Sequence, residues 1–128
     1  AVRTFWEKAT LLHAEAHRPK DKLMPARYAR HYHDMARLAE SPVAARALAD
    51  VALRERVVAH KAVYFRSGWA RYDLARPASF RLIPPDSRIP ALKSDHQAMI
   101  PMFFNPPPPI AEVLDTIADL ETRIRSLA

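Results

Sequence analysis

The end of the chain carries apolar side chains in alternating steps of three and four residues, at Ile110, Val113, Ile117, Leu120, Ile124 and Leu127. These steps place the side chains along one side of an α-helix, as a continuous apolar stripe. A stripe of this length must be covered, and a helix at the end of a chain covers it most simply against its own domain. The pattern therefore predicts a helix over residues 110–128 that docks on the core of a helical protein.

The rest of the chain also favours helices. Glycine, which disfavours helix, occurs once, as Gly68, and alanine, leucine and arginine are abundant. Thr4 and Glu7 have the spacing of a capping box, which predicts a first helix that starts at Thr4 and stops at Pro19. Pro25 predicts the start of a second helix, because proline suits the first helical position.

Three further helices are predicted before the C-terminal one. A short alanine-rich helix is expected over residues 43–49. A valine-rich helix, capped by Asp50 and apolar on both sides, is expected to run to about Phe65 as a central, largely buried element. The third is expected from about Pro90. Its predicted inner face consists of four residues with helical spacing, Leu92, His96, Met99 and Phe103.

Two proline-containing segments separate these helices. Residues 66–88 predict a long ordered loop, with a short strand at residues 79–83, and residues 105–109 predict a stiff polyproline connector. We therefore expect an all-α protein, a compact bundle of about six helices with one long basic–aromatic loop. Residues 1–104 would form the core of this single domain, and residues 110–128 would dock on it.

The charge of the chain is positive and concentrated in its middle. Twenty lysines and arginines oppose 14 aspartates and glutamates, which gives a formal charge of +6. Such a surface attracts polyanions, although a solvated arginine-rich surface would have the same composition. The chain has no cysteine, which excludes disulfides and thiolate metal sites and fits a reducing cytoplasm. No apolar run approaches the ~18–20 residues that a membrane span needs, so we expect a cytoplasmic protein without a membrane partner.

The sequence HYHDM, at residues 31–35, gathers three residue types that bind metals. On a helix, however, His31 and His33 point about 200° apart, so they cannot hold one ion together. His33 and Asp34 fall on the predicted polar side. Asp34 lies one turn from Arg30 and from Arg37, which predicts either a salt-bridged helix surface or a carboxylate held ionised beside a polyanion site.

The first helix raises two similar questions. His13 and His17 are one turn apart, but the glutamate of an HExxH metal motif is missing, so a surface pair is expected. Lys8 borders the apolar stripe of this helix. Its methylene groups could lie along the core with the ammonium in water, or the ammonium could point into a phosphate site, and the local pattern leaves both readings open.

Residues 61–81 alternate between positive charges and aromatic rings. The candidate nucleotide- or nucleic-acid-binding residues are Arg30, which precedes this segment, and Lys61, Arg66, Trp69, Arg71 and Arg76 within it. Phe65 and Phe80 are predicted to be buried, because a domain of this size needs aromatic volume in its core. Trp69 and Tyr72 could then stack on bases while the arginines meet phosphates. In the alternative interpretation, the aromatics pin the loop to the helices and the arginines are solvated.

Six blocks of sequence, taken in order, resemble one protein family. They are TFWEKATLLHAEAHRP, RYARHYHDMARLA, VVAHKAVYF, ARPASFRLIPP, LKSDHQAMIPMFF and IAEVLDTIADLETRI. In this order they are similar to the C-terminal half of AbiEii-type nucleotidyltransferase toxins of type IV toxin–antitoxin and phage-defence systems. The resemblance covers nearly all of the chain.

The resemblance implies two catalytic residues. Glu7-Lys8 matches a Glu-Lys motif of the family, and Asp34, after Arg30, matches an aspartate on a later helix. Lys8 would then neutralise triphosphate charge, and Asp34 would orient the nucleotide or act as a base. The family often has a second aspartate and a tyrosine where this chain has two histidines. We also expect Lys8 and Asp34 to converge on one concave, positively charged face, because a short connection lets the first two helices pack antiparallel.

The other motifs of the family are missing from this sequence. A glycine–serine nucleotide motif cannot be formed, because Gly68 is the only glycine and follows Ser67. Asp119 and Glu121 form the only Asp-x-Glu, and their carboxylates diverge on the predicted last helix. Two-metal phosphoryl transfer needs a carboxylate pair, so we expect no metal site in this chain and no activity from it alone.

These observations lead to two functional hypotheses. In the first, the chain is the C-terminal helical part of an AbiEii-like enzyme, which also has an N-terminal nucleotidyltransferase domain. The resemblance implies Mg²⁺ and a nucleoside triphosphate for the full-length enzyme, an RNA such as tRNA as acceptor, and a cognate antitoxin encoded nearby. In the alternative, the chain is a truncated, non-catalytic helical module that binds nucleic acid or a protein partner.

Overall fold

A computed structural model describes residues 1–65 and 68–128 of the chain. Six α-helices follow one another along the sequence: α1 (Val2–Ala16), α2 (Ala29–Glu40), α3 (Val43–Ala49), α4 (Val51–Tyr64), α5 (Ile89–Met99) and α6 (Ile110–Arg125). Five short 3-10 helices join them: η1 (Gly68–Ala70), η2 (Tyr72–Leu74), η3 (Pro77–Ser79), η4 (Asp86–Arg88) and η5 (Ile100–Met102). The described residues contain no strand, so the prediction of an all-α fold is confirmed.

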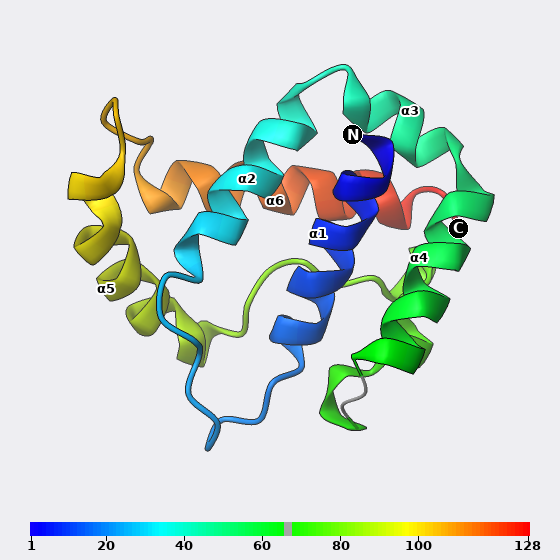
Figure 1. Ribbon diagram of the computed structural model, residues 1–128, viewed down its shortest axis with the longest axis horizontal. Helices are drawn as coiled ribbons and strands as arrows, with labels where there is room; N and C mark the ends of the chain where they lie inside the picture. The colour runs from blue at the N-terminus through cyan, green and yellow to red at the C-terminus, as the bar shows by residue number, and fades with distance from the viewer. Residues whose placement is uncertain (66–67) are drawn as a thin grey trace.

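Helix α1 occupies the centre of the molecule. It lies between α2 and α4 and also contacts α3 (Figure 1). Helix α6, the last helix of the chain, packs against α2, and α5 also contacts α2 (Figure 1). Helices α1 and α2 therefore have neighbours on several sides, and side chains from both can meet at one place on the surface.

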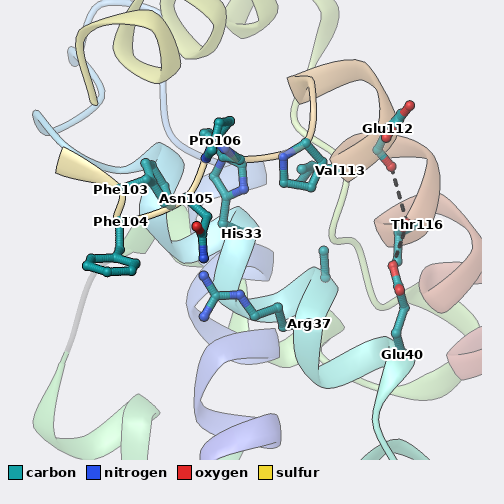
Figure 2. A pocket seen from close by; sticks show the side chains of 13 residues that line it. His33, Arg37, Glu40, Phe103, Phe104, Asn105, Pro106, Glu112, Val113 and Thr116 are labelled. Carbon is teal, nitrogen blue, oxygen red and sulfur yellow. Dashed lines mark hydrogen bonds between the residues drawn. The ribbon is translucent and has the colours of Figure 1, made fainter. Parts of the chain in front are cut away.

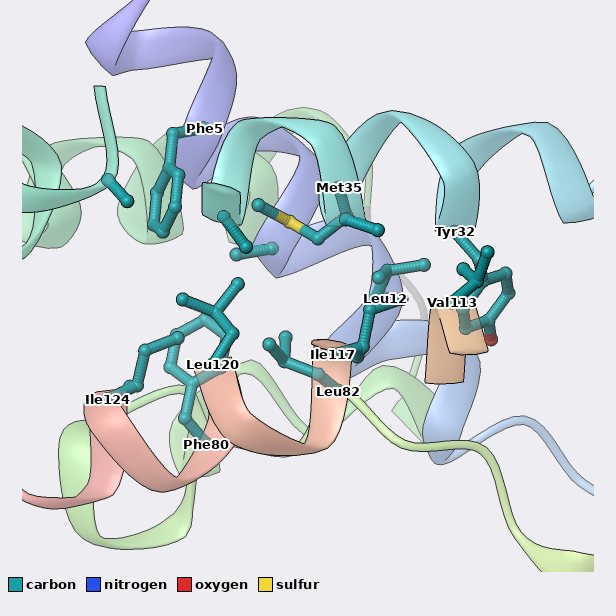
Figure 3. Packing of buried hydrophobic residues seen from close by; sticks show 14 of the residues in the cluster. Phe5, Leu12, Tyr32, Met35, Phe80, Leu82, Val113, Ile117, Leu120 and Ile124 are labelled. Carbon is teal, nitrogen blue, oxygen red and sulfur yellow. The ribbon is translucent and has the colours of Figure 1, made fainter. Parts of the chain in front are cut away.

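The hydrophobic core lies where α1, α2 and α6 meet. Phe5 and Leu12 from α1 and Met35 from α2 are fully buried there (Figure 3). The predicted stripe of α6 packs against them through five buried residues, Ile110, Val113, Ile117, Leu120 and Ile124. Leu127 lies beyond the end of this helix and is exposed.

The first two helices begin at other residues than predicted. Helix α1 starts at Val2, so Thr4 lies inside its first turn and the predicted capping box is wrong. Helix α2 starts at Ala29 rather than at Pro25, because Arg27 adopts a left-handed backbone with φ of 63° that a helix cannot include. The backbone N–H groups of Arg27 and Ala29 donate to the two carboxylate oxygens of Asp95, each at 2.7 Å. A side chain of α5 thus caps α2 across the fold.

Helix α4 is less buried than its valine-rich sequence predicted. Arg54 and Val57 are its only buried residues, so α4 is an outer helix rather than a central one. Its start agrees with the prediction, since Asp50 Oδ1 accepts a hydrogen bond from the N–H of Leu53 at 3.1 Å. Its end also agrees to within one residue.

Residues 68–88, most of the predicted long ordered loop, contain four short 3-10 helices that contact α1, α4, α5 and α6. The strand predicted at residues 79–83 is not formed, because side chains of α6 take the hydrogen bonds that a neighbouring strand would have made. Glu121 Oε1 accepts from the N–H groups of Leu82 and Ile83 at 2.6 and 3.2 Å, and Arg125 Nε donates to the carbonyl of Phe80 at 3.0 Å.

None of the helices in the described part of the chain has both the length and the apolar character needed to cross a membrane.

Candidate functional site

Lys8 and Asp34 meet at the surface between α1 and α2. The ammonium nitrogen of Lys8 lies 3.2 Å from Asp34 Oδ2 and 3.0 Å from His31 Nδ1. The side chains of Lys8 and Asp34 remain 24% and 31% exposed, respectively, so the cluster is open to solvent on one side. The two side chains therefore converge as predicted, whereas the concave shape expected of this face stays a prediction.

The packing of the two helices explains this meeting. Lys8 lies one turn from the buried residues Phe5 and Leu12, so the core contact of α1 holds the base of its side chain close to α2. His31 and Asp34 are three residues apart on α2, which places them on the same face of that helix, one turn from each other. Both can therefore reach the same ammonium group.

Positive charges dominate the surroundings of this cluster. Burial lowers the pKa of Lys61, and the Lys8 ammonium lowers it further against the opposing effect of Glu7. Burial, followed by the charge of Lys8, also lowers the pKa of His31, and Arg30 acts in the same direction. Cations from α1, α2 and α4 therefore act on this cluster together with the carboxylates of Glu7 and Asp34, and an excess of positive charge favours binding of an anion.

The arginines predicted to pair with Asp34 do not do so. Arg30 and Arg37 are exposed on α2, and within the described chain the ion pair of Asp34 is with Lys8. Helix spacing relates only residues on the same helix, whereas α1 brings in a lysine that is 26 residues away in sequence. Arg30 remains close enough to influence His31 electrostatically.

The aromatic and basic residues after α4 are largely engaged with the protein itself. The guanidinium of Arg18 lies 4.6 Å from the centre of the Trp69 ring, so one face of this ring is already covered. Arg71 forms a two-pronged ion pair with Asp73, with distances of 3.1 and 3.0 Å. Arg76 is exposed and donates to the carbonyl of Asp73 at 3.1 Å. Arg66, a further predicted contact, lies outside the described residues.

The two phenylalanines of this segment have different environments. Phe80 is fully buried, as predicted, and packs near Trp6 with a distance of 5.9 Å between ring centres. Phe65 is 57% exposed, so its predicted burial is wrong. It follows the last residue of the outer helix α4, where its ring lies 4.8 Å from the ammonium of Lys61. The apolar residues of α4 in the sequence did not indicate that only one side of this helix packs against the rest of the protein.

His13 holds this segment to α1. It was predicted to be on the surface but is fully buried. Its Nδ1 accepts from the N–H of Arg81 at 3.1 Å, so its Nε2 carries the proton and donates to the carbonyl of Arg71 at 2.8 Å. Burial lowers the pKa of His13 to about 4, which keeps the ring neutral in this arrangement. No sequence pattern indicated this role, because both partners are backbone groups about 60 residues away.

His33 was predicted on the polar side of α2 but is also buried. Its ring stacks on His96 of α5 and shares a hydrogen bond of 2.9 Å with it. His33 and Arg37 border a pocket of about 630 Å³, which is closed by Phe103, Asn105 and the proline connector (Figure 2). The pocket wall includes both acidic and basic side chains, and Lys8, His31 and Asp34 are not among the residues that line it.

The described residues do not provide a metal site. They contain no group of three or more histidine, cysteine, aspartate or glutamate side chains that could hold one ion. At the Lys8 cluster, Asp34 is the only carboxylate that contacts the lysine, and that ammonium would repel a cation. The cluster therefore fits an anion, such as a phosphate group, better than Mg²⁺.

Comparison with known proteins identifies one family. No curated protein and no solved structure shows a significant match to the chain. The family described as "Nucleotidyl transferase AbiEii toxin, Type IV TA system" matches residues 1–120, which include α1, α2 and the Lys8–Asp34 pair. This match extends over nearly the whole sequence, and the chain therefore belongs to the AbiEii nucleotidyltransferase toxin family.

Proposed function

We propose that this chain is the helical C-terminal part of an AbiEii-like nucleotidyltransferase toxin, and that Lys8 and Asp34 belong to its active site. The contact between these two side chains carries the proposal, because they come from different helices and are held together at a partly exposed, cationic surface. Structural ion pairs of this size are common on protein surfaces, but nucleotidyl transfer, the activity that the family description names, is a reaction in which a cation and a carboxylate can both serve.

The proposed chemistry uses the charges of the pair. The Lys8 ammonium would neutralise the negative charge of a nucleoside triphosphate, and it would do so most strongly as charge develops in the transition state. Asp34 would orient the nucleotide or accept a proton from the attacking hydroxyl. In the described structure Asp34 holds Lys8 at 3.2 Å, so a bound phosphate would compete with this carboxylate for the ammonium.

We further propose that the metal-dependent half of the reaction belongs to a separate N-terminal nucleotidyltransferase domain. The sequence has no glycine–serine motif and no Asp-x-Asp, and the described residues offer no group of metal ligands. A paired carboxylate in that domain would hold Mg²⁺, which polarises the phosphate being transferred. The present chain would contribute Lys8 and Asp34 to the shared site, and a cognate antitoxin would be the second partner in the cytoplasm.

A nucleotidyl-transfer assay tests whether the reaction requires the proposed N-terminal domain. The purified chain is incubated with labelled nucleoside triphosphates, Mg²⁺ and total tRNA, and we expect no labelled RNA, since the chain lacks the metal-binding carboxylates. Labelling that disappears in both Lys8→Ala and Asp34→Ala variants would show that the chain is catalytic by itself. Labelling that survives both substitutions would point to contamination.

Binding of a phosphate probe tests the role of Lys8 directly. Isothermal titration with inorganic tripolyphosphate should give measurable binding that Lys8→Met weakens by about tenfold, the effect of a lost charge-assisted hydrogen bond. Lys93→Met serves as a matched control, because this exposed lysine lies on α5. Equal affinities for the wild type and Lys8→Met would refute a phosphate-binding role.

We propose an RNA such as tRNA as the acceptor, and Arg71 and Arg76 as phosphate contacts. Their exposure and the net charge of +6 support this proposal, although Arg71 would have to share its guanidinium with Asp73. Affinity for tRNA should fall steeply as salt rises, and the combined change of both arginines to alanine should reduce that slope by about one to two units. If the double substitution does not alter the salt dependence of tRNA affinity, the segment has a structural role only.

A further inference from the structure

We propose that His31 is a positioning residue, which holds the Lys8 ammonium beside Asp34 through its unprotonated Nδ1. This proposal rests on the phosphate-binding function proposed for Lys8 and adds a proton-dependent control of that group. The three side chains form one network, in which a single ammonium nitrogen lies 3.0 Å from His31 Nδ1 and 3.2 Å from Asp34 Oδ2.

The chemistry of the two groups determines which one donates. A charged lysine has three N–H donors and no acceptor, so the contact with His31 requires a lone pair on Nδ1. The imidazole must therefore be neutral, with its proton on Nε2. Protonation of Nδ1 would place two positive groups 3.0 Å apart and break the contact.

The orientation of the His31 ring is restrained by Tyr28, the residue just before α2. The Tyr28 ring packs edge-on against the His31 ring, with 4.8 Å between ring centres, and the Tyr28 carbonyl accepts a hydrogen bond from the backbone N–H of His31 at 3.0 Å. Tyr28 is itself half-buried, and burial together with the Glu15 carboxylate raises its pKa to about 12, so it remains a neutral phenol. The neutral Tyr28 ring thus helps to keep His31 Nδ1 directed at the Lys8 ammonium.

The charges around His31 favour its neutral form. Lys8 faces it from α1, Lys61 from α4, and Arg30 from its own helix, whereas Asp34 is the opposing carboxylate. Burial is the largest cause of its lowered pKa, and the Lys8 charge is the next. At neutral pH the ring therefore accepts a hydrogen bond, and it loses this ability only when the solution becomes acidic.

As a consequence, the Lys8 ammonium donates hydrogen bonds to two acceptors, His31 Nδ1 and Asp34 Oδ2. With His31 in place, Asp34 does not hold Lys8 alone, and the remaining N–H of the ammonium can meet a phosphate oxygen. Without this acceptor, the contact with Asp34 would be the only one that orients the ammonium, and its third N–H would no longer be held in position for an anion. Removal of a neutral side chain should therefore weaken anion binding.

The first experiment measures the network itself, without any assumption about function. Long-range ¹H–¹⁵N spectra of the histidine rings in the full chain should show His31 as the Nε2–H tautomer at neutral pH. Lys8→Met should raise the pKa of His31, and it should do so more than Lys61→Met, which removes a lysine of the same cluster that makes no hydrogen bond to His31. An Nδ1–H tautomer, or equal effects of the two lysine changes, would overturn the proposal.

The second experiment measures the effect on anion binding. Titration with inorganic tripolyphosphate at neutral pH compares His31→Phe, which keeps a ring beside Tyr28 but has no acceptor, with His31→Asn, which keeps an acceptor but does not titrate. We expect about fivefold weaker binding for His31→Phe, the equivalent of one hydrogen bond, and binding within about twofold of the wild type for His31→Asn. Equal affinities for the wild type and His31→Phe would overturn the positioning role.

The two experiments separate the two proposals. If the wild-type chain binds no tripolyphosphate, the phosphate-binding function of Lys8 fails, while the His31 tautomer and the response to Lys8→Met still decide whether His31 positions the lysine. Circular dichroism of each variant verifies that it is folded. His60→Phe provides a matched histidine control, because His60 is exposed on α4 and should leave both readouts unchanged.

Discussion

His13 should make the stability of the protein depend on pH in a way that one substitution removes. The ring is fully buried between α1 and the segment after α4, where it accepts from one backbone N–H and donates to one backbone carbonyl. Protonation of Nδ1 would destroy the first of these bonds and bury a charge. The folded protein therefore resists protonation at this position more strongly than the unfolded chain does.

The size of the effect follows from the two pKa values. Burial lowers the pKa of His13 from 6.5 to about 4, so between these values the unfolded state binds more protons than the folded state. The free energy of unfolding therefore rises with pH through this window. The stabilising contribution of neutral His13 is fully present above about pH 6.5 and is lost as the pH falls towards about 4. Since one pKa unit corresponds to about 1.4 kcal/mol, the loss should be roughly 2 kcal/mol at about pH 5 and roughly 3 kcal/mol at about pH 4.

Urea unfolding followed by circular dichroism at several pH values provides the measurement. His13→Gln keeps a donor for the Arg71 carbonyl but cannot titrate, so it should be less stable than the wild type at neutral pH and should lose less stability on acidification. His60→Gln, a change at an exposed histidine of α4, should leave the His13 contribution in place. If His13→Gln shows the same pH dependence as the wild type, the neutral buried histidine is not the cause.

Four further substitutions, one of them a control, test the contacts that define the fold, each by urea unfolding. Phe80→Ala should cost about 3–5 kcal/mol because it leaves a cavity in the core, whereas Phe65→Ala should cost less than about 1 kcal/mol, and equal costs would contradict the different burial of the two rings. Asp95→Asn should cost about 1–2 kcal/mol and speed hydrogen exchange at the start of α2, and unchanged exchange there would refute the cap across the fold. Glu121→Ala should cost about 2–3 kcal/mol because two backbone N–H groups lose their acceptor, while a cost near zero would mean that water replaces it.

The candidate site could be predicted from the sequence only in part. The resemblance to a family pointed to Lys8 and Asp34, and the structure places them in contact. Helix spacing predicted arginines on the same helix as partners of Asp34, because a periodic pattern describes only residues along one helix. His31 was considered as a metal ligand and rejected on the direction of its side chain, and its contact with Lys8 depends on how α1 and α2 pack.

The sequence by itself determined the elements of this protein that depend on local interactions. The apolar stripe of α6, the Asp50 cap of α4 and the scarcity of glycine each act within a few residues, so they specified an all-α chain and the side of α6 that faces the core. The tertiary structure alone decided which groups from distant segments meet. Asp95 capping α2, His13 holding the segment after α4, and Lys8 shared between His31 and Asp34 are all hydrogen bonds between residues more than 20 positions apart. Such bonds form only after burial of the core has fixed the helices relative to one another, and for this reason no local pattern encodes them.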